Sequence, residues 1–374
     1  MTEYEVEMAL AGGVNLSYWN PGSEYKAQIK DILKFDFESD FFDYEYYISE
    51  KFQKVVATKL GVSESDFKFA GLSVFSQSTV SIVTVSAFLA KKNLKLGIIS
   101  PVYFSVQTCC NDLKIPYMFF DEFAENINEN FDPDLLLKSE CDAFWFTSPI
   151  NSTSIYFSQK VKEGIQKLLD LGKWVFLDES LCVYGKELLR TFGIIQDKLF
   201  NIYSPHKTLG IQGVKFSVVV AHRKYYNEID CLKDCYGGSL NCSNLQGVTH
   251  FASPNFDECV TFYNKFWRDN LGLVKSILTQ YDFAHVSSEI AGHYAMIFMN
   301  SSVETPKFVK AMKVLMQEQG YYVFPGFMQG FDTTRRFCFR VNLLLNKVDL
   351  EKGLVAVLDY FKNTLFVANS MKGE

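Results

Sequence analysis

Two apolar runs decide the fold that the sequence predicts: Lys173-Trp-Val-Phe-Leu-Asp-Glu-Ser180 and Leu199-Phe-Asn-Ile-Tyr-Ser-Pro-His-Lys207. Short continuous apolar runs are typical of strands buried in a parallel sheet. The first run stops on a carboxylate, Asp178, and the second delivers an amine, Lys207, just beyond its end. Because ligands on such sheets bind outside the carboxyl ends of the strands, we expect both side chains at a ligand site.

Strands and helices alternate on either side of these runs. Further strands are expected at residues 94–100, 117–120, 143–147 and 216–221. Ser158 is placed to cap a helix whose apolar positions, Val161, Ile165 and Leu168, share one face, and Gly172 is placed to end it. The alternation predicts an α/β unit with a mainly parallel sheet and crossover helices.

The last part of the chain has a different rhythm. A long helix is expected at 256–281, then a strand at 293–300, a helix at 306–319, strands at 321–324 and 337–344, and a helix at 349–365. Phe308, Met312 and Leu315 fall along one side of the second helix. This mixture predicts a smaller α+β domain.

Composition and charge exclude several classes of protein. A chain of 374 residues, 48% of them hydrophobic, is long enough for two unequal globular domains. The net charge of −6 argues against nucleic-acid binding, and no apolar run reaches the length of a membrane span. The acidic start is unlike a signal peptide, so we expect a cytoplasmic protein. The nine cysteines lack framework spacing, which predicts reduced thiols and no metal site.

The paired acid and lysine suit one cofactor in particular. Pyridoxal phosphate needs a partner for its pyridinium nitrogen and an amine to condense with. Between a predicted strand and a long apolar helix lies a hydroxyl-rich turn, Ser76-Gln-Ser-Thr79. A helix N-terminus with such hydroxyls is a ready phosphate site, although plain helix capping explains the same residues.

Taken in order, these motifs resemble fold-type I pyridoxal-phosphate enzymes of the class I/II aminotransferase family, near histidinol-phosphate and aspartate aminotransferases. The resemblance runs from about Tyr44 to Arg340. It implies a large domain with a mostly parallel seven-stranded sheet at residues 41–280, and a small α+β domain built from residues 1–40 and 281–374. It also implies an amino acid and an oxo acid as substrates, and a homodimer with shared active sites.

The resemblance gives individual residues a role. Lys207 is similar to the Schiff-base lysine, and Asp178 to the carboxylate that keeps the pyridine nitrogen protonated. Arg340 resembles the arginine that clamps the substrate α-carboxylate, for which its planar fork is suited; a structural salt bridge is the alternative for a buried arginine. The remaining implied cofactor contacts are Ser78, Thr79, Tyr103, Asn151, Ser204, Lys215 and Tyr44, the last reaching the phosphate of the partner subunit.

Several positions depart from the family pattern. Leu181 stands where a tyrosine commonly contacts the ring oxygen, and Lys215 stands where an arginine commonly binds the phosphate. Gln77 replaces a glycine of the phosphate turn, and the family's Asn-Pro-Thr-Gly is Asn151-Ser-Thr-Ser154 here. None of these changes removes the lysine or the aspartate, so they indicate a divergent member.

Three functions remain open on the sequence. The first is an aminotransferase that acts on an amino acid. The second keeps the cofactor but ends in elimination, cyclisation or decarboxylation, since the outcome depends on which substrate bond stands perpendicular to the ring. The third is a non-catalytic relative that binds pyridoxal phosphate. A nicotinamide enzyme is excluded because no Gly-x-Gly-x-x-Gly follows a strand.

Overall fold

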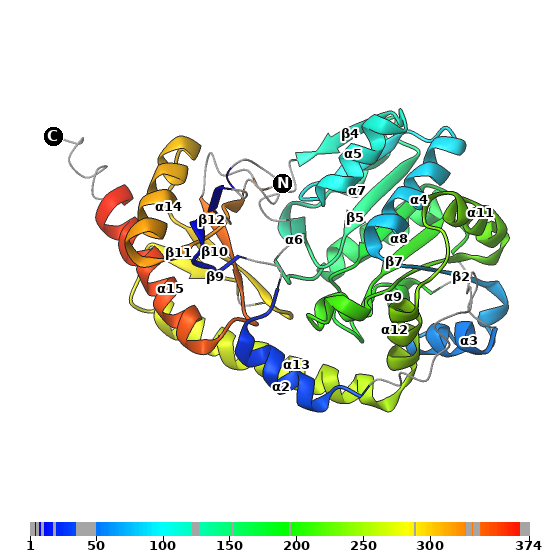
Figure 1. Ribbon diagram of the computed structural model, residues 1–374. Coiled ribbons are helices and arrows are strands. Elements are labelled where there is room, and N and C mark those ends of the chain that lie inside the picture. The colour runs from blue at the N-terminus through cyan, green and yellow to red at the C-terminus, as the bar shows by residue number, and fades with distance from the viewer. Residues whose placement is uncertain are drawn as a thin grey trace. The chain divides into compact units, whose positions relative to one another are not determined.

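The computed structural model describes residues 4, 7–8, 11–17, 20–34, 50–121, 127–151, 153–193, 196–287, 289–326, 331 and 337–366. The chain forms two compact units (Figure 1). The larger unit comprises residues 32–261, and the smaller unit comprises residues 1–31 together with 262–374.

The larger unit is built on a seven-stranded sheet. In chain order its strands are β2 (Ala70–Phe75), β3 (Leu96–Ile99), β4 (Tyr117–Phe120), β5 (Ala143–Thr147), β6 (Trp174–Glu179), β7 (Leu199–Tyr203) and β8 (Ser217–His222). Their order in space is β2-β8-β7-β6-β5-β3-β4. β8 runs antiparallel to both of its neighbours, and the other pairs are parallel. The predicted α/β fold with a mostly parallel seven-stranded sheet is confirmed.

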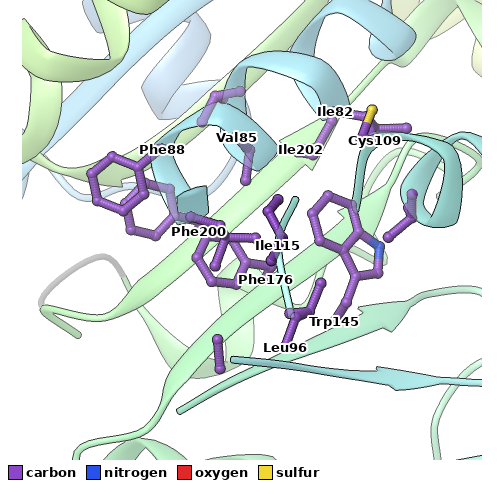
Figure 2. Close-up of a cluster of buried hydrophobic side chains, with 14 of the residues drawn as sticks. Ile82, Val85, Phe88, Leu96, Cys109, Ile115, Trp145, Phe176, Phe200 and Ile202 are labelled. Atoms are coloured by element: carbon purple, nitrogen blue, oxygen red, sulfur yellow. The ribbon is translucent and has the colours of Figure 1, made fainter. Parts of the chain in front are cut away.

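Helices cover this sheet. They are α3 (Glu50–Lys59), α4 (Ser78–Lys91), α5 (Phe104–Asp112), α6 (Ile127–Asn130), α7 (Pro133–Lys138), α8 (Gln159–Asp170), α9 (Leu189–Phe192), α10 (Pro205–Thr208), α11 (Tyr226–Tyr236) and α12 (Cys242–Ala252). Short 3-10 turns lie at Phe67–Phe69, Gln212–Val214 (η3) and Arg223–Tyr225. On one face, Phe88 of α4 packs with Trp145, Phe176 and Phe200 of the sheet in one buried apolar cluster (Figure 2).

Helix α8 shows how local sequence sets an element. The hydroxyl of Ser158 accepts a hydrogen bond from Val161 N, which caps the helix. Val161, Ile165 and Leu168 recur at helical spacing and are fully buried. Gly172 adopts a φ of +75° directly after the helix, a conformation that glycine takes without strain. The predicted helix is confirmed.

The smaller unit mixes sheets and helices, as predicted. β9 (Ala284–Val286), β10 (Tyr294–Met299) and β12 (Cys338–Asn342) form an antiparallel sheet in the order β12-β10-β9. β1 (Val14–Asn15) pairs in parallel with β11 (Tyr321–Tyr322). Its helices are α2 (Ser23–Ile32), α14 (Thr305–Gln319), α15 (Lys347–Tyr360) and a π-helical turn at Phe361–Phe366, while α13 (Pro254–Leu278) starts in the larger unit. Within the described ranges, no helix is long and apolar enough to cross a membrane.

Candidate active site

One edge of the large sheet collects most of the predicted site residues. Tyr103 follows β3, Asn151 follows β5, Asp178 is the next-to-last residue of β6, and Lys207 follows β7. Lys215 precedes β8, which runs in the opposite direction, so its start lies at the edge where the parallel strands end. The topology therefore brings residues more than a hundred positions apart to the same edge, as the sequence predicted.

Strand alternation decides which acidic side chain of β6 faces the apolar cluster. Asp178 and Glu179 are adjacent, so their side chains point to opposite faces of the sheet. Asp178 shares a face with Phe176, which belongs to that cluster. Its side chain is 3% exposed, and Ser180 donates to Asp178 Oδ1 through both N (3.1 Å) and Oγ (2.6 Å). Asp178 is thus a buried carboxylate held in one orientation at the strand end.

Glu179 is buried on the opposite face of the sheet. Asn201 Nδ2 donates to Glu179 Oε2, and Leu188 N donates to Oε1 at 2.8 Å. Burial raises the pKa of Glu179 to about 8. The side chain is therefore predominantly a neutral acid near pH 7. The two neighbouring carboxyl groups thus have different environments, set by their faces.

Lys207 and Tyr103 meet in the structure. Lys207 lies on α10, a single turn that starts with Pro205 at its first position. Its Nζ is 5.5 Å from the centroid of the Tyr103 ring, within the range of a cation–π contact. Ser204, before the turn, is 1% exposed and its hydroxyl donates to Phe216 O at 2.7 Å. The single hydroxyl proton of Ser204 is thus used within the protein.

The start of α4 offers N–H groups at the same edge. Gln77 is the N-cap residue, with an extended backbone, and its side chain makes no capping hydrogen bond. Ser78 and Thr79, the first two residues of the helix, have no hydrogen-bond acceptor for their N–H groups among the described residues. A helix N-terminus with open N–H groups favours an anion.

The turn after β5 holds Asn151 in a buried position. Ile150 N donates to Ile155 O at 2.8 Å, and Thr153 N donates to Ile150 O at 3.0 Å. Asn151 is 5% exposed. Ser154 adopts a φ of +55°, the left-handed conformation that favours glycine, so the serine at this position of the motif keeps a glycine-like backbone.

Thr147, the last residue of β5, is a site feature that the sequence did not indicate. It pairs in register with Asp178 on the neighbouring strand. Its hydroxyl oxygen is buried and has no hydrogen-bond partner among the described residues. Since buried hydroxyls normally have a partner, this oxygen is one that a bound polar ligand could satisfy.

Arg340 belongs to the smaller unit and lies on β12. Its side chain is fully buried, its Nε donates to Ser17 O at 3.1 Å, and its guanidinium carbon is 4.6 Å from the centroid of the Tyr294 ring. These contacts fix the plane of the guanidinium group. Tyr44 lies outside the described residues.

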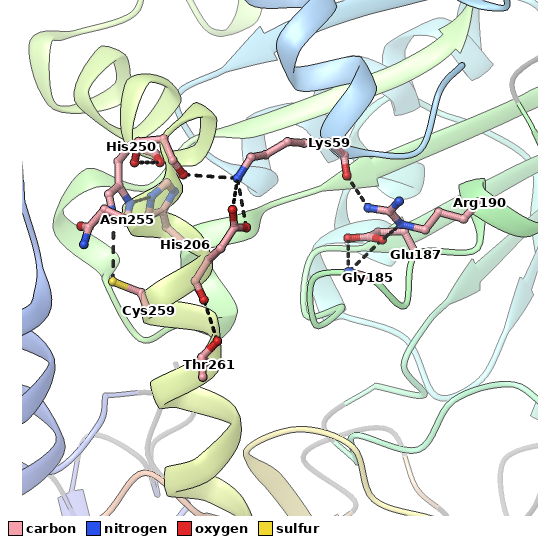
Figure 3. Close-up of polar contacts among 11 residues, drawn as sticks. Lys59, Gly185, Glu187, Arg190, His206, His250, Asn255, Cys259 and Thr261 are labelled. Carbon is pink, nitrogen blue, oxygen red and sulfur yellow. Dashed lines mark hydrogen bonds and ion pairs between the residues drawn. The ribbon is translucent and has the colours of Figure 1, made fainter. Parts of the chain in front are cut away.

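A pair of histidines next to Lys207 is a second feature that the sequence did not indicate (Figure 3). His206 Nε2 is 2.9 Å from His250 Nδ1, and His250 Nε2 is 3.2 Å from Asn255 Oδ1. Asn255 Oδ1 also accepts from Lys34 N, so it is an acceptor and His250 Nε2 is the donor. His250 Nδ1 then accepts from His206, which keeps its own proton on Nε2. Burial lowers the pKa of His206 to about 3, so the ring is neutral at ordinary pH.

Comparison with known proteins gives one family match. Residues 9–357 match the model for aminotransferase class I and II. A search of curated proteins finds no match.

Solved structures share the fold at low sequence identity. Kynurenine aminotransferase from Pyrococcus horikoshii is 13% identical, with a TM-score of 0.77 over 98% of this chain and 95% of that one. A double mutant of Thermus thermophilus aspartate aminotransferase is 15% identical, with a TM-score of 0.73 over 96% and 97% of the two chains. A pyridoxal-phosphate-bound C–S lyase from Staphylococcus hominis is 13% identical, with a TM-score of 0.70 over 93% and 92%.

Proposed function

The chain belongs to the aminotransferase class I and II family and is a pyridoxal-phosphate-dependent transferase, and on that premise we propose that it moves the amino group of an amino acid to an oxo acid with Lys207 as the cofactor-bonding residue. The observation that carries the proposal is the approach of Lys207 Nζ to the Tyr103 ring, 5.5 Å from its centroid. This pair lies at the sheet edge that also carries the oriented, buried carboxylate of Asp178.

The donor set fits pyridoxal phosphate. Asp178 supplies a buried acceptor for a protonated ring nitrogen, and the Tyr103 ring supplies a flat surface for stacking. The open N–H groups of Ser78 and Thr79, together with the cation of Lys215, suit a phosphate. We assign Asn151 to the ring hydroxyl of the cofactor and Ser204 to its phosphate. The Ser204 hydroxyl donates to Phe216 O here, so it would have to rotate to donate to a phosphate.

When bound, pyridoxal phosphate supplies an aldehyde that condenses with amines and a ring that withdraws electrons from the substrate Cα. With the cofactor bound, Asp178 would favour a protonated ring nitrogen, because its carboxylate is buried and little solvated. Ser180 occupies Oδ1 of the carboxylate, so Oδ2 would be the oxygen available to a protonated ring nitrogen. The carboxylate of Asp178 would thus keep the ring nitrogen protonated, and a protonated ring withdraws electrons more strongly.

Two basic residues act on the substrate in this proposal. Lys207 Nζ would hold the cofactor and, once the substrate amine had replaced it, would be the base that takes the proton from the substrate Cα. Arg340 binds the substrate α-carboxylate with its planar fork, whose orientation Ser17 O and the Tyr294 ring set.

Lyase chemistry on an amino acid is the second candidate. The observation that favours it is Leu181, a half-buried apolar side chain in the turn after β6, where the resemblance leads one to expect a tyrosine hydroxyl. Without that hydroxyl, the partition between transamination and elimination depends on other residues. A homodimer with shared sites, with Tyr44 reaching the phosphate of the partner subunit, and a cytoplasmic location remain parts of the proposal.

The test is the absorption spectrum of the purified protein with pyridoxal phosphate, before and after borohydride, beside Lys207→Ala. We expect a visible band in the wild type that borohydride abolishes and that the variant lacks. Lys207→Arg is the matched control, because it keeps the charge but cannot form the same bond.

Product analysis then separates the candidates. A transaminase yields an oxo acid and leaves the cofactor as its amine, whereas a lyase returns the aldehyde and releases ammonia or another leaving group. A Lys207→Ala variant that keeps the borohydride-sensitive band would refute the assignment of Lys207. A wild type that shows no such band at saturating cofactor would point to the non-catalytic reading.

A further inference from the structure

Asn244, on the first turn of α12, joins two backbone segments at the phosphate-binding end of the candidate site. Its side-chain Nδ2 donates to Ser76 O at 3.1 Å and to Lys215 O at 2.9 Å. Ser76 lies directly before the N-terminal turn of α4, and Lys215 is the cation proposed for the phosphate. We propose that Asn244 is a positioning residue that sets the phosphate subsite by fixing these two segments against each other, an inference that rests on the function proposed above.

The Asn244 side chain is held rigidly enough for this role. It is 4% exposed, and its Oδ1 accepts from Asn241 N at 3.1 Å. Its own N donates to Asn241 Oδ1 at 3.0 Å, so the two asparagines form a reciprocal capping box. Both Nδ2 donors and the Oδ1 atom of the amide therefore have a partner, and these contacts fix its orientation.

The two segments that Asn244 joins lie where regular pairing stops. β2 and β8 pair up to Phe75 opposite Ser217. Ser76 and Lys215 lie just beyond this last pair, at the end of the ladder. The two hydrogen bonds of Asn244 replace the missing strand pairing and hold Ser76 and Lys215 together.

Peptide geometry connects this arrangement to an anion. A planar trans peptide carries its C=O and N–H on opposite sides. With Ser76 O directed to Asn244, the N–H of Gln77 is turned away from α12 and precedes the N–H groups of Ser78 and Thr79. None of these three N–H groups has an acceptor among the described residues. Three successive open N–H groups favour an anion at this position.

Helix α12 is packed closely enough to transmit this constraint. A Cβ placed on Gly247, one turn after Asn244, would lie 2.0 Å from Val214 O. The helix therefore touches the backbone of η3 directly, next to Lys215. The close approach explains how a side chain as short as asparagine reaches both carbonyls.

The experiment compares pyridoxal phosphate with pyridoxal, which lacks the phosphate, as ligands of the full-length cofactor-free protein. Asn244→Ala removes both donors, and Asn244→Asp keeps the size and the acceptor oxygen but also removes them. We expect both variants to bind pyridoxal phosphate about tenfold more weakly, the scale of a lost net hydrogen bond, and to bind pyridoxal as the wild type does. Asn241→Ala is the matched control, because it removes the cap of the same helix and leaves Nδ2 in place.

The ratio of the two affinities separates positioning from general stability. If Asn244 had only a structural role, its replacement would weaken the binding of both ligands equally, or Asn241→Ala would lower the ratio of pyridoxal phosphate affinity to pyridoxal affinity as much as Asn244→Ala does. Either result would overturn the proposal. If the wild type binds pyridoxal phosphate and pyridoxal with equal affinity, the assignment of the phosphate subsite is wrong while the assignment of Lys207 stands. If Lys207→Ala keeps the borohydride-sensitive band, the proposed function fails instead.

Discussion

Replacing Glu179 with glutamine should remove a pH dependence from the stability of the larger unit. The folded protein raises the pKa of this buried carboxyl group from 4.5 to about 8, chiefly by desolvation. The folded state therefore binds the Glu179 proton more tightly than the unfolded state does. The stabilisation from this proton is fully present below about pH 4.5 and is lost as the pH rises towards about 8.

The structure also indicates how glutamine would fit. Asn201 Nδ2 donates to Glu179 Oε2, while Asn201 Oδ1 is buried and has no hydrogen-bond partner among the described residues. A glutamine Nε2 can donate to Asn201 Oδ1 once the Asn201 amide rotates by half a turn. The neutral pair thus replaces the acid without leaving the new donor unpaired.

The expected size follows from the pKa shift. Each pH unit within the window changes the free energy of unfolding of the wild type by about 1.4 kcal/mol relative to Glu179→Gln. Between pH 5.5 and 7.5 the difference between the two proteins should therefore grow by roughly 3 kcal/mol in favour of the variant. Urea unfolding of the cofactor-free proteins, followed by tryptophan fluorescence at several pH values, measures this difference.

Glu163→Gln is the control, because it makes the same substitution at an exposed position on α8 and leaves Glu179 in place. A difference between wild type and Glu179→Gln that stays constant across the window would refute the reasoning. It would mean that Glu179 is already ionised when the protein is folded near neutral pH.

Three further predictions concern the site. Gly247→Ala should lower the free energy of unfolding by about 1–3 kcal/mol and weaken cofactor binding, because its Cβ would lie 2.0 Å from Val214 O. Gly272→Ala on α13 is the control: its Cβ would meet nothing within 4 Å, so it should neither lower the free energy of unfolding nor weaken cofactor binding. Urea unfolding and cofactor titration compare the two variants. Asp178→Asn should keep the cofactor but lower kcat about a hundredfold or more, whereas an unchanged kcat would contradict its role. Ser180→Ala removes one of the two donors to Asp178 and should lower kcat by about tenfold, read from the same steady-state assay.

Much of the fold could be predicted because it depends on short-range patterns. The apolar run at 173–178 and the capped, amphipathic segment from Ser158 to Gly172 specify a strand and a helix through neighbouring residues alone. Their alternation limits the connections to parallel crossovers, so the sheet follows. The positions of Asp178 at the end of one strand and of Lys207 past the end of the next were predictable for the same reason.

The site was less completely predictable, because its supporting contacts join distant parts of the chain. Asn244 lies 168 positions from Ser76, and His250 lies 44 positions from His206. Neither residue carries a local pattern that marks it. Only the packing of α12 against the sheet edge brings them into hydrogen-bonding distance.

By itself, the sequence determined the order of the strands and helices along the chain and the residue types at the strand ends, because periodicity and turn chemistry act over a few residues. The tertiary structure alone decided the environments of Asp178 and Glu179. The two side chains are adjacent, and alternation puts them on opposite faces. The packing of helices on the sheet decides which face continues the apolar cluster. It also decides which face buries Glu179 beside Asn201. That packing is set by contacts between residues far apart in sequence.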